Sequence, residues 1–134
     1  MVKQTSSDQA RILVVDDDEL VSEYLAALLQ AEDYDVTVFN ESAVALNYFK
    51  NHPDNFDLIL TDQIMPQLTG VEIAQEMLKL RPDIPILLIT GYSDKISAQN
   101  ASSFGLKGYF AKPINEAHFL TEIKNILSCQ LRAS

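Results

Sequence analysis

The sequence has no tryptophan, four glycines and a single cysteine, Cys129, among its 134 residues. One cysteine cannot form an internal disulfide, which fits a protein of a reducing compartment that is held together by an apolar core. No apolar run approaches the ~20 residues of a membrane-spanning helix. Residues 1–10 are polar and lack the apolar segment of a secretory signal. We therefore expect a cytoplasmic protein with a flexible N-terminal segment.

Positive charge is also scarce. Ten Lys and Arg stand against 19 Asp and Glu, which gives a formal net charge of −9. Nucleic acids and anionic membrane surfaces attract proteins through basic patches, so the composition argues against both as partners. The length suits one domain, and 47% hydrophobic residues are enough to build its core.

Short apolar runs alternate along the chain with stretches of helical periodicity. Asn40 is a candidate cap for the second of these helices, and Pro82 closes the third. The predicted strands are Ile12–Asp16, Val36–Phe39, Leu58–Asp62, Ile84–Ile89 and Tyr109–Ala111. The predicted helices cover about Asp18–Ala31, Ser42–Lys50, Val71–Leu78, Ser93–Ser103 and Asn115–Cys129.

This alternation predicts an α/β fold. Five strands alternating with five helices imply βαβ units and a doubly wound, five-stranded parallel sheet covered on both faces. The continuous β-branched run in Ile12–Asp16 is typical of a central strand buried on both sides. In such sheets, ligands bind beyond the carboxyl ends of the strands, so the residues that end the strands are the candidates for function.

The strand ends carry three acids, a hydroxyl and a lysine. Singly, each has an ordinary explanation, because an acid after a strand is most often a solvated turn or a helix cap. Neighbouring strands lie ~4.8 Å apart, so carboxylates at adjacent strand ends should crowd one another. Two carboxylates ~4 Å apart repel by roughly 4 kcal/mol at an effective dielectric of 20, and such a cluster must hold a proton or bind a cation. The residues are Asp16, Asp17, Asp62, Thr90 and Lys112.

The chemistry of this set favours Mg²⁺. Hard carboxylate oxygens, with no His or Cys nearby in the sequence, suit Mg²⁺ better than zinc, and Mg²⁺ is commonly shared with phosphate oxygens. Beside it, Lys112 would neutralise phosphoryl oxygens, Thr90 would donate a hydrogen bond to them, and a carboxylate would serve as nucleophile. The residues therefore predict a site that handles phosphoryl groups.

Four segments, ILVVDDDE, LILTDQIMPQLTG, ILLITGYSD and GYFAKPI, resemble in order and spacing the motifs of two-component response-regulator receiver domains. The resemblance runs from Arg11 to about Cys129, and we expect a receiver domain over residues 11–130 with no output domain. It implies a flavodoxin-like receiver fold with strand order 2-1-3-4-5 and five helices. The stretch from Thr61 to Lys95 looks particularly like receivers fused to hybrid sensor kinases. A free-standing regulator and a part of a longer protein both stay open.

The resemblance implies the metal ligands and the acceptor. Asp62 matches the phosphoacceptor, and the phosphodonor would be the phosphohistidine of a sensor histidine kinase or of a phosphotransfer domain. Asp17 would bind Mg²⁺ directly and Asp16 largely through water, with the carbonyl of Ile64 as a further ligand. Such a domain is not an enzyme acting on a separate substrate. It catalyses its own phosphorylation and slow dephosphorylation.

The resemblance also implies a conformational switch. Thr90 matches the switch hydroxyl, Lys112 the phosphoryl-binding lysine and Tyr109 the aromatic switch residue, and the Lys112–Pro113 peptide is cis in family members. On phosphorylation, Thr90 would move inward and Tyr109 would rotate into the space it leaves. That motion would remodel the face formed by the fourth helix, fifth strand and fifth helix, where a downstream protein docks. The domain would be a monomer or a phosphorylation-dependent homodimer.

Three smaller features concern the surroundings of the site. Gly91 would leave space beside the phosphoryl group, whereas Gly70 would begin the turn into the third helix, for which a simple turn glycine is an equally good explanation. Ile64 and Tyr92 are bulky and largely apolar. They flank the path of the water that hydrolyses the acyl phosphate in receivers, so we hypothesise that they shield it and slow dephosphorylation.

Two other functions are compatible with parts of the pattern. Asp16 and Asp18 form an Asp-x-Asp pair after a strand, as in haloacid-dehalogenase-type phosphatases, which would make Asp16 the nucleophile of a hydrolase. The chain lacks the usual residues after that motif and a later pair of acids. The second alternative is a receiver-like interaction module that is never phosphorylated, against which the complete set of site residues argues.

Overall fold

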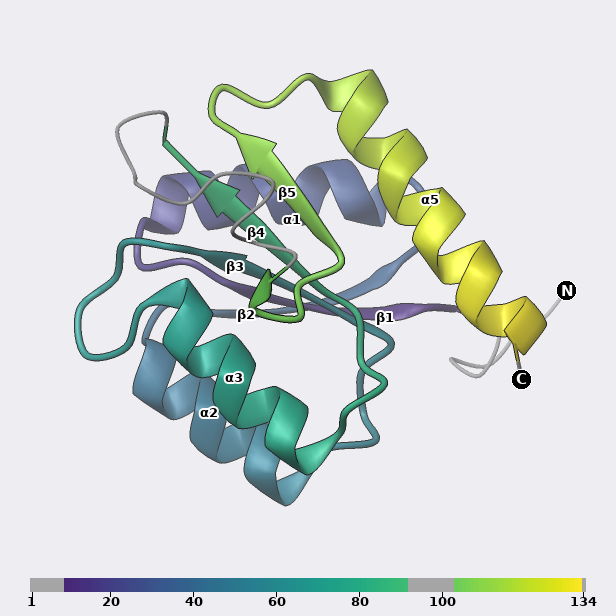
Figure 1. Cartoon of the computed structure of the whole chain (residues 1–134). Helices are drawn as coiled ribbons and strands as arrows, with labels where there is room; N and C mark the ends of the chain where they lie inside the picture. Colours follow the sequence, from purple (N-terminus) through teal and green to yellow (C-terminus); the bar gives the residue numbers. More distant parts are fainter. Residues whose placement is uncertain (1–8, 92–102, 134) are drawn as a thin grey trace, which may run out of the picture.

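The computed structural model describes residues 9–91 and 103–133. Its five parallel strands form one sheet in the order β2-β1-β3-β4-β5 (Figure 1). The strands are β1 (Arg11–Val15), β2 (Asp35–Phe39), β3 (Leu58–Asp62), β4 (Ile86–Thr90) and β5 (Gly108–Ala111). The described helices are α1 (Glu19–Gln30), α2 (Ser42–Asn51), α3 (Gly70–Leu80) and α5 (Glu116–Ala133).

The helices cover both faces of the sheet. Helices α2 and α3 lie on one face, and α1 and α5 on the other (Figure 1). Each face has its own buried core: Phe49 of α2 and Met77 of α3 belong to one, and Leu25 of α1 and Phe119 of α5 to the other. The sheet is thus the middle layer of three, as the alternation of strands and helices predicted.

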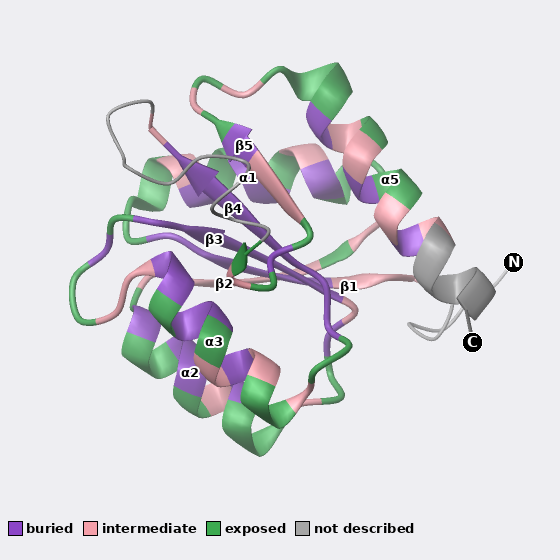
Figure 2. Ribbon diagram, in the orientation of Figure 1, coloured by how far each residue is buried: buried purple, intermediate pink, exposed green. Residues whose placement is uncertain are grey.

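Burial along the strands follows from this arrangement. Every residue of β3 and β4 is buried, as is β1 after its first residue, whereas β2 and β5 at the sheet edges are mostly half-buried (Figure 2). Strands covered on both faces tolerate continuous apolar sequence, which explains the apolar runs within β1, β3 and β4.

The register of the sheet determines which residues meet at its carboxyl edge. Val15 lies opposite Thr61, so the residues that follow them, Asp16 and Asp62, are neighbours on adjacent strands. Thr90 lies opposite Ala111, which brings Lys112 level with the end of β4. One edge of the sheet therefore carries all the strand-end residues singled out from the sequence.

The five strands and their order are confirmed, but the count of five helices is not. The expected helix over Ser93–Ser103 and the residue Tyr92 fall on residues 92–102, almost wholly outside the described part of the chain. The four helices of the described part correspond to the other four predicted. Within the described ranges, no helix combines the length and the apolar character needed to cross a membrane.

Candidate functional site

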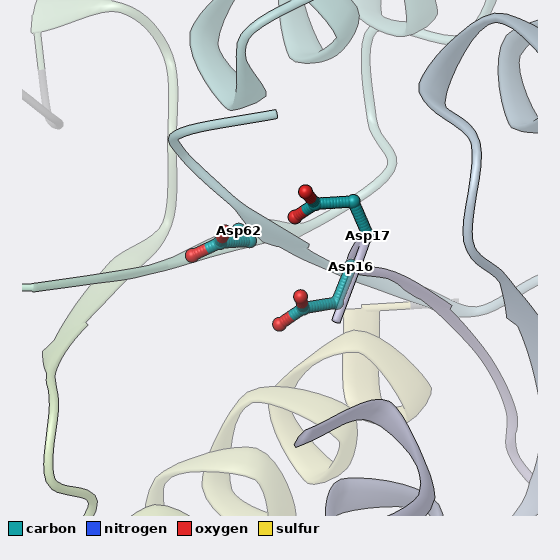
Figure 3. Close-up of side chains that lie close together, drawn as sticks. All are labelled: Asp16, Asp17 and Asp62. Atoms are coloured by element: carbon teal, nitrogen blue, oxygen red, sulfur yellow. The ribbon is translucent and has the colours of Figure 1, made fainter. Parts of the chain in front are cut away.

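Three carboxylates converge at the ends of β1 and β3. Asp16, Asp17 and Asp62 each contribute one carboxylate oxygen to a group in which all lie within 4.8 Å of one another (Figure 3). Asp16 and Asp62 are buried, and Asp17 is exposed. The crowding expected from the strand ends is present, because parallel neighbours at this register bring both strand ends to the same place.

Asp16 is the most deeply buried of the three, with 1% of its surface exposed. Its Oδ1 accepts a hydrogen bond from the Asp18 N–H at 2.9 Å. Its Oδ2 is buried without a hydrogen-bond partner among the described residues, and Lys112 Nζ lies 4.0 Å away. Burial raises the pKa of Asp16 to about 6, and the negative charge of Asp62 adds to the shift. A buried carboxylate oxygen that has no hydrogen bond within the described part of the chain, and that lies beside two other carboxylates, is a group that a cation would stabilise.

Removing the Asp16 charge should therefore stabilise the metal-free protein at neutral pH. The folded pKa of about 6 lies above the ordinary 3.8, so ionisation of Asp16 opposes folding. This penalty grows as pH rises between those two values and is complete above them. Asp16→Asn is expected to raise the free energy of unfolding at pH 7 in chelator, and the gain should disappear below about pH 4. Denaturant unfolding at both pH values measures it.

A matched control for this measurement is Asp83→Asn, because the Asp83 side chain is 75% exposed and its ion pair with Arg81, at 3.4 Å, lies at the surface, where such pairs contribute little. It should change stability by less than ~0.5 kcal/mol at either pH. Equal stability of the Asp16→Asn protein and its parent at pH 7 would contradict the assigned cost of burying this charge.

Lys112 faces the acceptor candidate. Its Nζ lies 3.0 Å from Asp62 Oδ1, and its side chain is one-third exposed. Burial raises the pKa of Asp62, while the hydrogen bond and charge of Lys112 act in the opposite direction. Burial alone would lower the pKa of Lys112, but the hydrogen bond to Asp62 and its charge outweigh this and raise it. Lys112 is therefore held as a cation directly against Asp62.

Thr90 and Tyr109 lie on the neighbouring strands. Thr90 ends β4 fully buried, with its Oγ1 3.4 Å from the carbonyl oxygen of Gly91, which is long for a hydrogen bond. Its own carbonyl accepts the Lys112 N–H at 2.8 Å, so these two residues are tied together through the backbone. The Lys112–Pro113 peptide is cis, as the resemblance implied. Tyr109 is half-buried against the core that α2 and α3 share.

Ile64 lies two residues beyond Asp62, and 60% of its surface is exposed. Its proposed companion Tyr92 lies outside the described residues, so the shielding hypothesis stays a prediction.

Asn40 is bonded to the backbone of the site, a contact that the sequence did not predict. The prediction that it caps α2 is wrong: the N-cap residue is Glu41, whose side chain makes no capping hydrogen bond. Asn40 Nδ2 instead donates to the carbonyl of Asp16 at 2.7 Å and to Ser22 Oγ at 3.0 Å. Because β1 and β2 are paired, an amide just beyond β2 reaches the carbonyl just beyond β1. An asparagine directly after a strand is the only signal in the sequence, and it fits either role.

Gly70 is more than a turn glycine. A Cβ at this position would lie 2.4 Å from the carbonyl oxygen of Asp62 and 2.6 Å from Leu88 Cδ1, so the first residue of α3 packs directly on β3. At Gly91, by contrast, a Cβ would meet no atom of the described residues within 4 Å. Gly70 therefore sets the distance between α3 and β3.

The strand order defines a doubly wound α/β domain, and the three acids lie at the switch point between β1 and β3, where ligands bind in such sheets. The family model described as the response regulator receiver domain matches residues 12–124, and the chain belongs to this family. This membership argues against the dehalogenase-type phosphatase as an alternative.

Curated relatives agree with this family. The two-component response regulator ARR10 from Arabidopsis thaliana is 32% identical over 124 residues, which cover 92% of this chain and 22% of that protein. The response regulator receiver protein CpdR from Brucella abortus (strain 2308) is 30% identical over 117 residues, which cover 87% of this chain and 96% of that protein. The chain thus spans about a fifth of the first relative and nearly all of the second.

Solved structures confirm the fold. A response regulator receiver domain protein from Clostridium thermocellum superimposes with a TM-score of 0.87 at 27% identity, covering 93% of this chain and 99% of that one. A CheY-like receiver domain protein from Methanospirillum hungatei JF-1 gives a TM-score of 0.86 at 29% identity, covering 95% and 100%. The flavodoxin-like receiver architecture expected from the motifs is thus the one adopted.

Proposed function

We propose that this receiver domain accepts a phosphoryl group on Asp62, in a reaction that requires Mg²⁺. The donor is the phosphohistidine of a sensor histidine kinase or of a phosphotransfer domain. The observation that carries the proposal is the 3.0 Å contact between Lys112 Nζ and Asp62 Oδ1, made beside two further carboxylates. A fixed ammonium at the nucleophile is suited to neutralising the oxygens of an incoming phosphoryl group.

The carboxylates fit Mg²⁺. Asp16 Oδ2 is buried without a hydrogen-bond partner in the described part of the chain, and the donors around it are all hard oxygens. In this proposal Asp17 binds the ion directly, Asp16 acts largely through water, and Asp62 and the Ile64 carbonyl complete the protein's ligands. The bound ion would supply additional positive charge for the phosphoryl oxygens.

Residues of the chain itself carry out the transfer of the phosphoryl group. An oxygen of the ionised Asp62 carboxylate attacks phosphorus, the P–N bond to the donor imidazole breaks, and its electron pair stays on the leaving nitrogen. Lys112 neutralises charge on the transferred group, and Thr90 turns its hydroxyl toward a phosphoryl oxygen. The product is an acyl phosphate on Asp62.

The added phosphoryl group would drive the switch. It carries about 1.5–2 negative charges and three acceptor oxygens, which favour the state with Thr90 turned inward. Tyr109, half-buried in the described structure, would then move into the vacated space. The face of β5, α5 and the expected helix over Ser93–Ser103 would change, and with it the binding of a downstream protein or of a second copy of this chain.

Mass spectrometry of the intact protein after incubation with acetyl phosphate tests the proposal. With Mg²⁺ the chain should gain one phosphoryl group, and with a chelator in place of Mg²⁺ it should gain none. If the chain gains no phosphoryl group under either condition, the result would favour an interaction module that works without phosphorylation.

The apolar side chains near the acceptor should slow loss of the phosphoryl group. An Ile64→Asn, Tyr92→Ala double variant is expected to dephosphorylate about tenfold faster, a change of about 1.4 kcal/mol in the barrier. The reason is that smaller or polar side chains admit the attacking water. Decay of the phosphorylated species after removal of the donor measures the rate.

The control for this prediction is Leu80→Asn at the far end of α3, where another apolar side chain is 46% exposed. It should leave the decay rate unchanged. A double variant that keeps its phosphoryl group as long as the parent would show that Ile64 and Tyr92 do not shield it.

A further inference from the structure

Gln63 follows the proposed phosphoacceptor Asp62, and only 9% of its surface is exposed. It makes three hydrogen bonds to other parts of the chain. Its N–H donates to the carbonyl of Ile89 in β4 at 3.2 Å, and its carbonyl accepts the N–H of Gly70 at 3.0 Å. Its side-chain Oε1 accepts the N–H of Val71 at 3.0 Å. One residue thus joins the end of β3 both to β4 and to the first turn of α3.

The first turn of α3 depends on these bonds. The first amides of a helix have no partner within the helix and must be satisfied from outside. Thr69 Oγ1 accepts the N–H of Glu72 at 3.2 Å, as part of a capping box. Gln63 supplies the acceptors for the two preceding amides, one from its backbone and one from its side chain. The Gln63 side chain is therefore a cap for α3 that comes from the residue directly after β3.

The first turn of α3 also packs against Asp62. Gly70 approaches Asp62 so closely that a Cβ there would lie 2.4 Å from the Asp62 carbonyl oxygen. The carbonyl of Gln63 also accepts the N–H of Gly70 at 3.0 Å, so the start of α3 is bonded to the residue that directly follows Asp62. Any shift of the start of α3 is therefore transmitted to the peptide units on which the Asp62 carboxylate depends.

We propose that the side chain of Gln63 is a positioning residue for phosphorylation. By holding Val71 and the first turn of α3 against β3, it sets the orientation of the Asp62 carboxylate toward Lys112. The inference rests on the proposed role of Asp62 as the acceptor.

The same loop offers a matched control. Gln67 is also a glutamine whose Oε1 caps a helix: it accepts the N–H of Ala43, in the first turn of α2, at 3.2 Å. This contact is exposed and faces α2 instead of the acceptor strand. Methionine at either position keeps the length of the side chain and removes the acceptor. Each substitution removes one helix cap, worth about 1 kcal/mol. Because Gln63 is buried and Gln67 is exposed, denaturant unfolding of both variants is measured beside the rates, so that an effect on Asp62 is separated from a loss of stability.

The test measures the phosphorylation rate at saturating Mg²⁺ and acetyl phosphate. Gln63→Met is expected to react about tenfold more slowly than the parent, because small displacements of reacting groups cost that much or more. Gln67→Met should react at the parent rate. Gln63→Glu keeps an acceptor oxygen for Val71, at a helix N-terminus that favours negative charge, and should restore most of the rate. Gln63→Asn, whose shorter amide withdraws the acceptor, is measured alongside Gln63→Met in case the latter does not fold.

Each outcome bears on one claim. A parent protein that gains no phosphoryl group refutes the proposed function, whatever the variants do. With an active parent, positioning by Gln63 is refuted by parent-like rates in both Gln63→Met and Gln63→Asn. It is equally refuted if Gln63→Glu is no faster than Gln63→Met, or if Gln67→Met is slowed as much as Gln63→Met.

Discussion

Asp62→Asn is expected to abolish the gain of a phosphoryl group from acetyl phosphate and Mg²⁺. The amide that replaces the carboxylate has no ionised oxygen with which to attack phosphorus. Asp16 and Asp17 are not expected to take over, although an oxygen of each lies within 4.8 Å of one of Asp62. Lys112 Nζ lies 3.0 Å from Asp62 and 4.0 Å from Asp16, so the fixed ammonium favours Asp62 as the acceptor. Intact-protein mass spectrometry measures the result.

Two further variants make this result specific. Asp83→Asn removes an exposed carboxylate between α3 and β4 and should be phosphorylated like the parent. Asp16→Asn should be phosphorylated more slowly than the parent but should still gain the phosphoryl group. If the gain were lost in Asp16→Asn and kept in Asp62→Asn, Asp16 would be the nucleophile. Thermal unfolding of Asp62→Asn should show an intact fold, because the substitution removes one of three crowded charges. Undiminished labelling of Asp62→Asn would refute the proposed acceptor.

Gly70→Ala is expected to lower the free energy of unfolding by about 3 kcal/mol or more, a large loss for one added methyl group. In most helices alanine is more stable than glycine by up to about 1 kcal/mol, so the usual trend is reversed. The added Cβ would lie 2.4 Å from a backbone oxygen of β3, and neither the strand nor the helix can withdraw without breaking other contacts. Denaturant unfolding measures the effect.

Two other glycines complete a graded series. At Gly108 the nearest atom to an added Cβ is Leu87 Cδ2 at 2.7 Å, the end of a flexible side chain that can move, so Gly108→Ala should cost about 1 kcal/mol. At Gly91 an added Cβ has no neighbour within 4 Å among the residues that the structure describes, so Gly91→Ala should stay within ~0.5 kcal/mol of the parent. If Gly70→Ala proves no less stable than Gly91→Ala, α3 does not press on β3 as described.

The sequence predicted the fold through features that are local. Continuous apolar runs and helical spacing mark strands and helices without reference to distant residues, and their alternation leads to a parallel sheet. Where the prediction failed, at Asn40, the residue type was compatible with two partners. The nearer partner was determined by the pairing of β1 with β2. A polar residue directly after a strand has no periodicity to interpret, which is why the cap that Gln63 provides for α3 also gave no signal.

By itself, the order of residues determined the α/β class and the gathering of Asp16, Asp62 and Lys112 at one sheet edge, because parallel strands all end on the same side. Only the tertiary structure decided that one oxygen of Asp16 is buried without a hydrogen-bond partner in the described part of the chain. It also decided that Lys112 lies against Asp62, and that Gly70 is pressed onto β3. These are distances between residues far apart in the chain. They depend on strand register and on how closely a helix packs, which local periodicity does not encode.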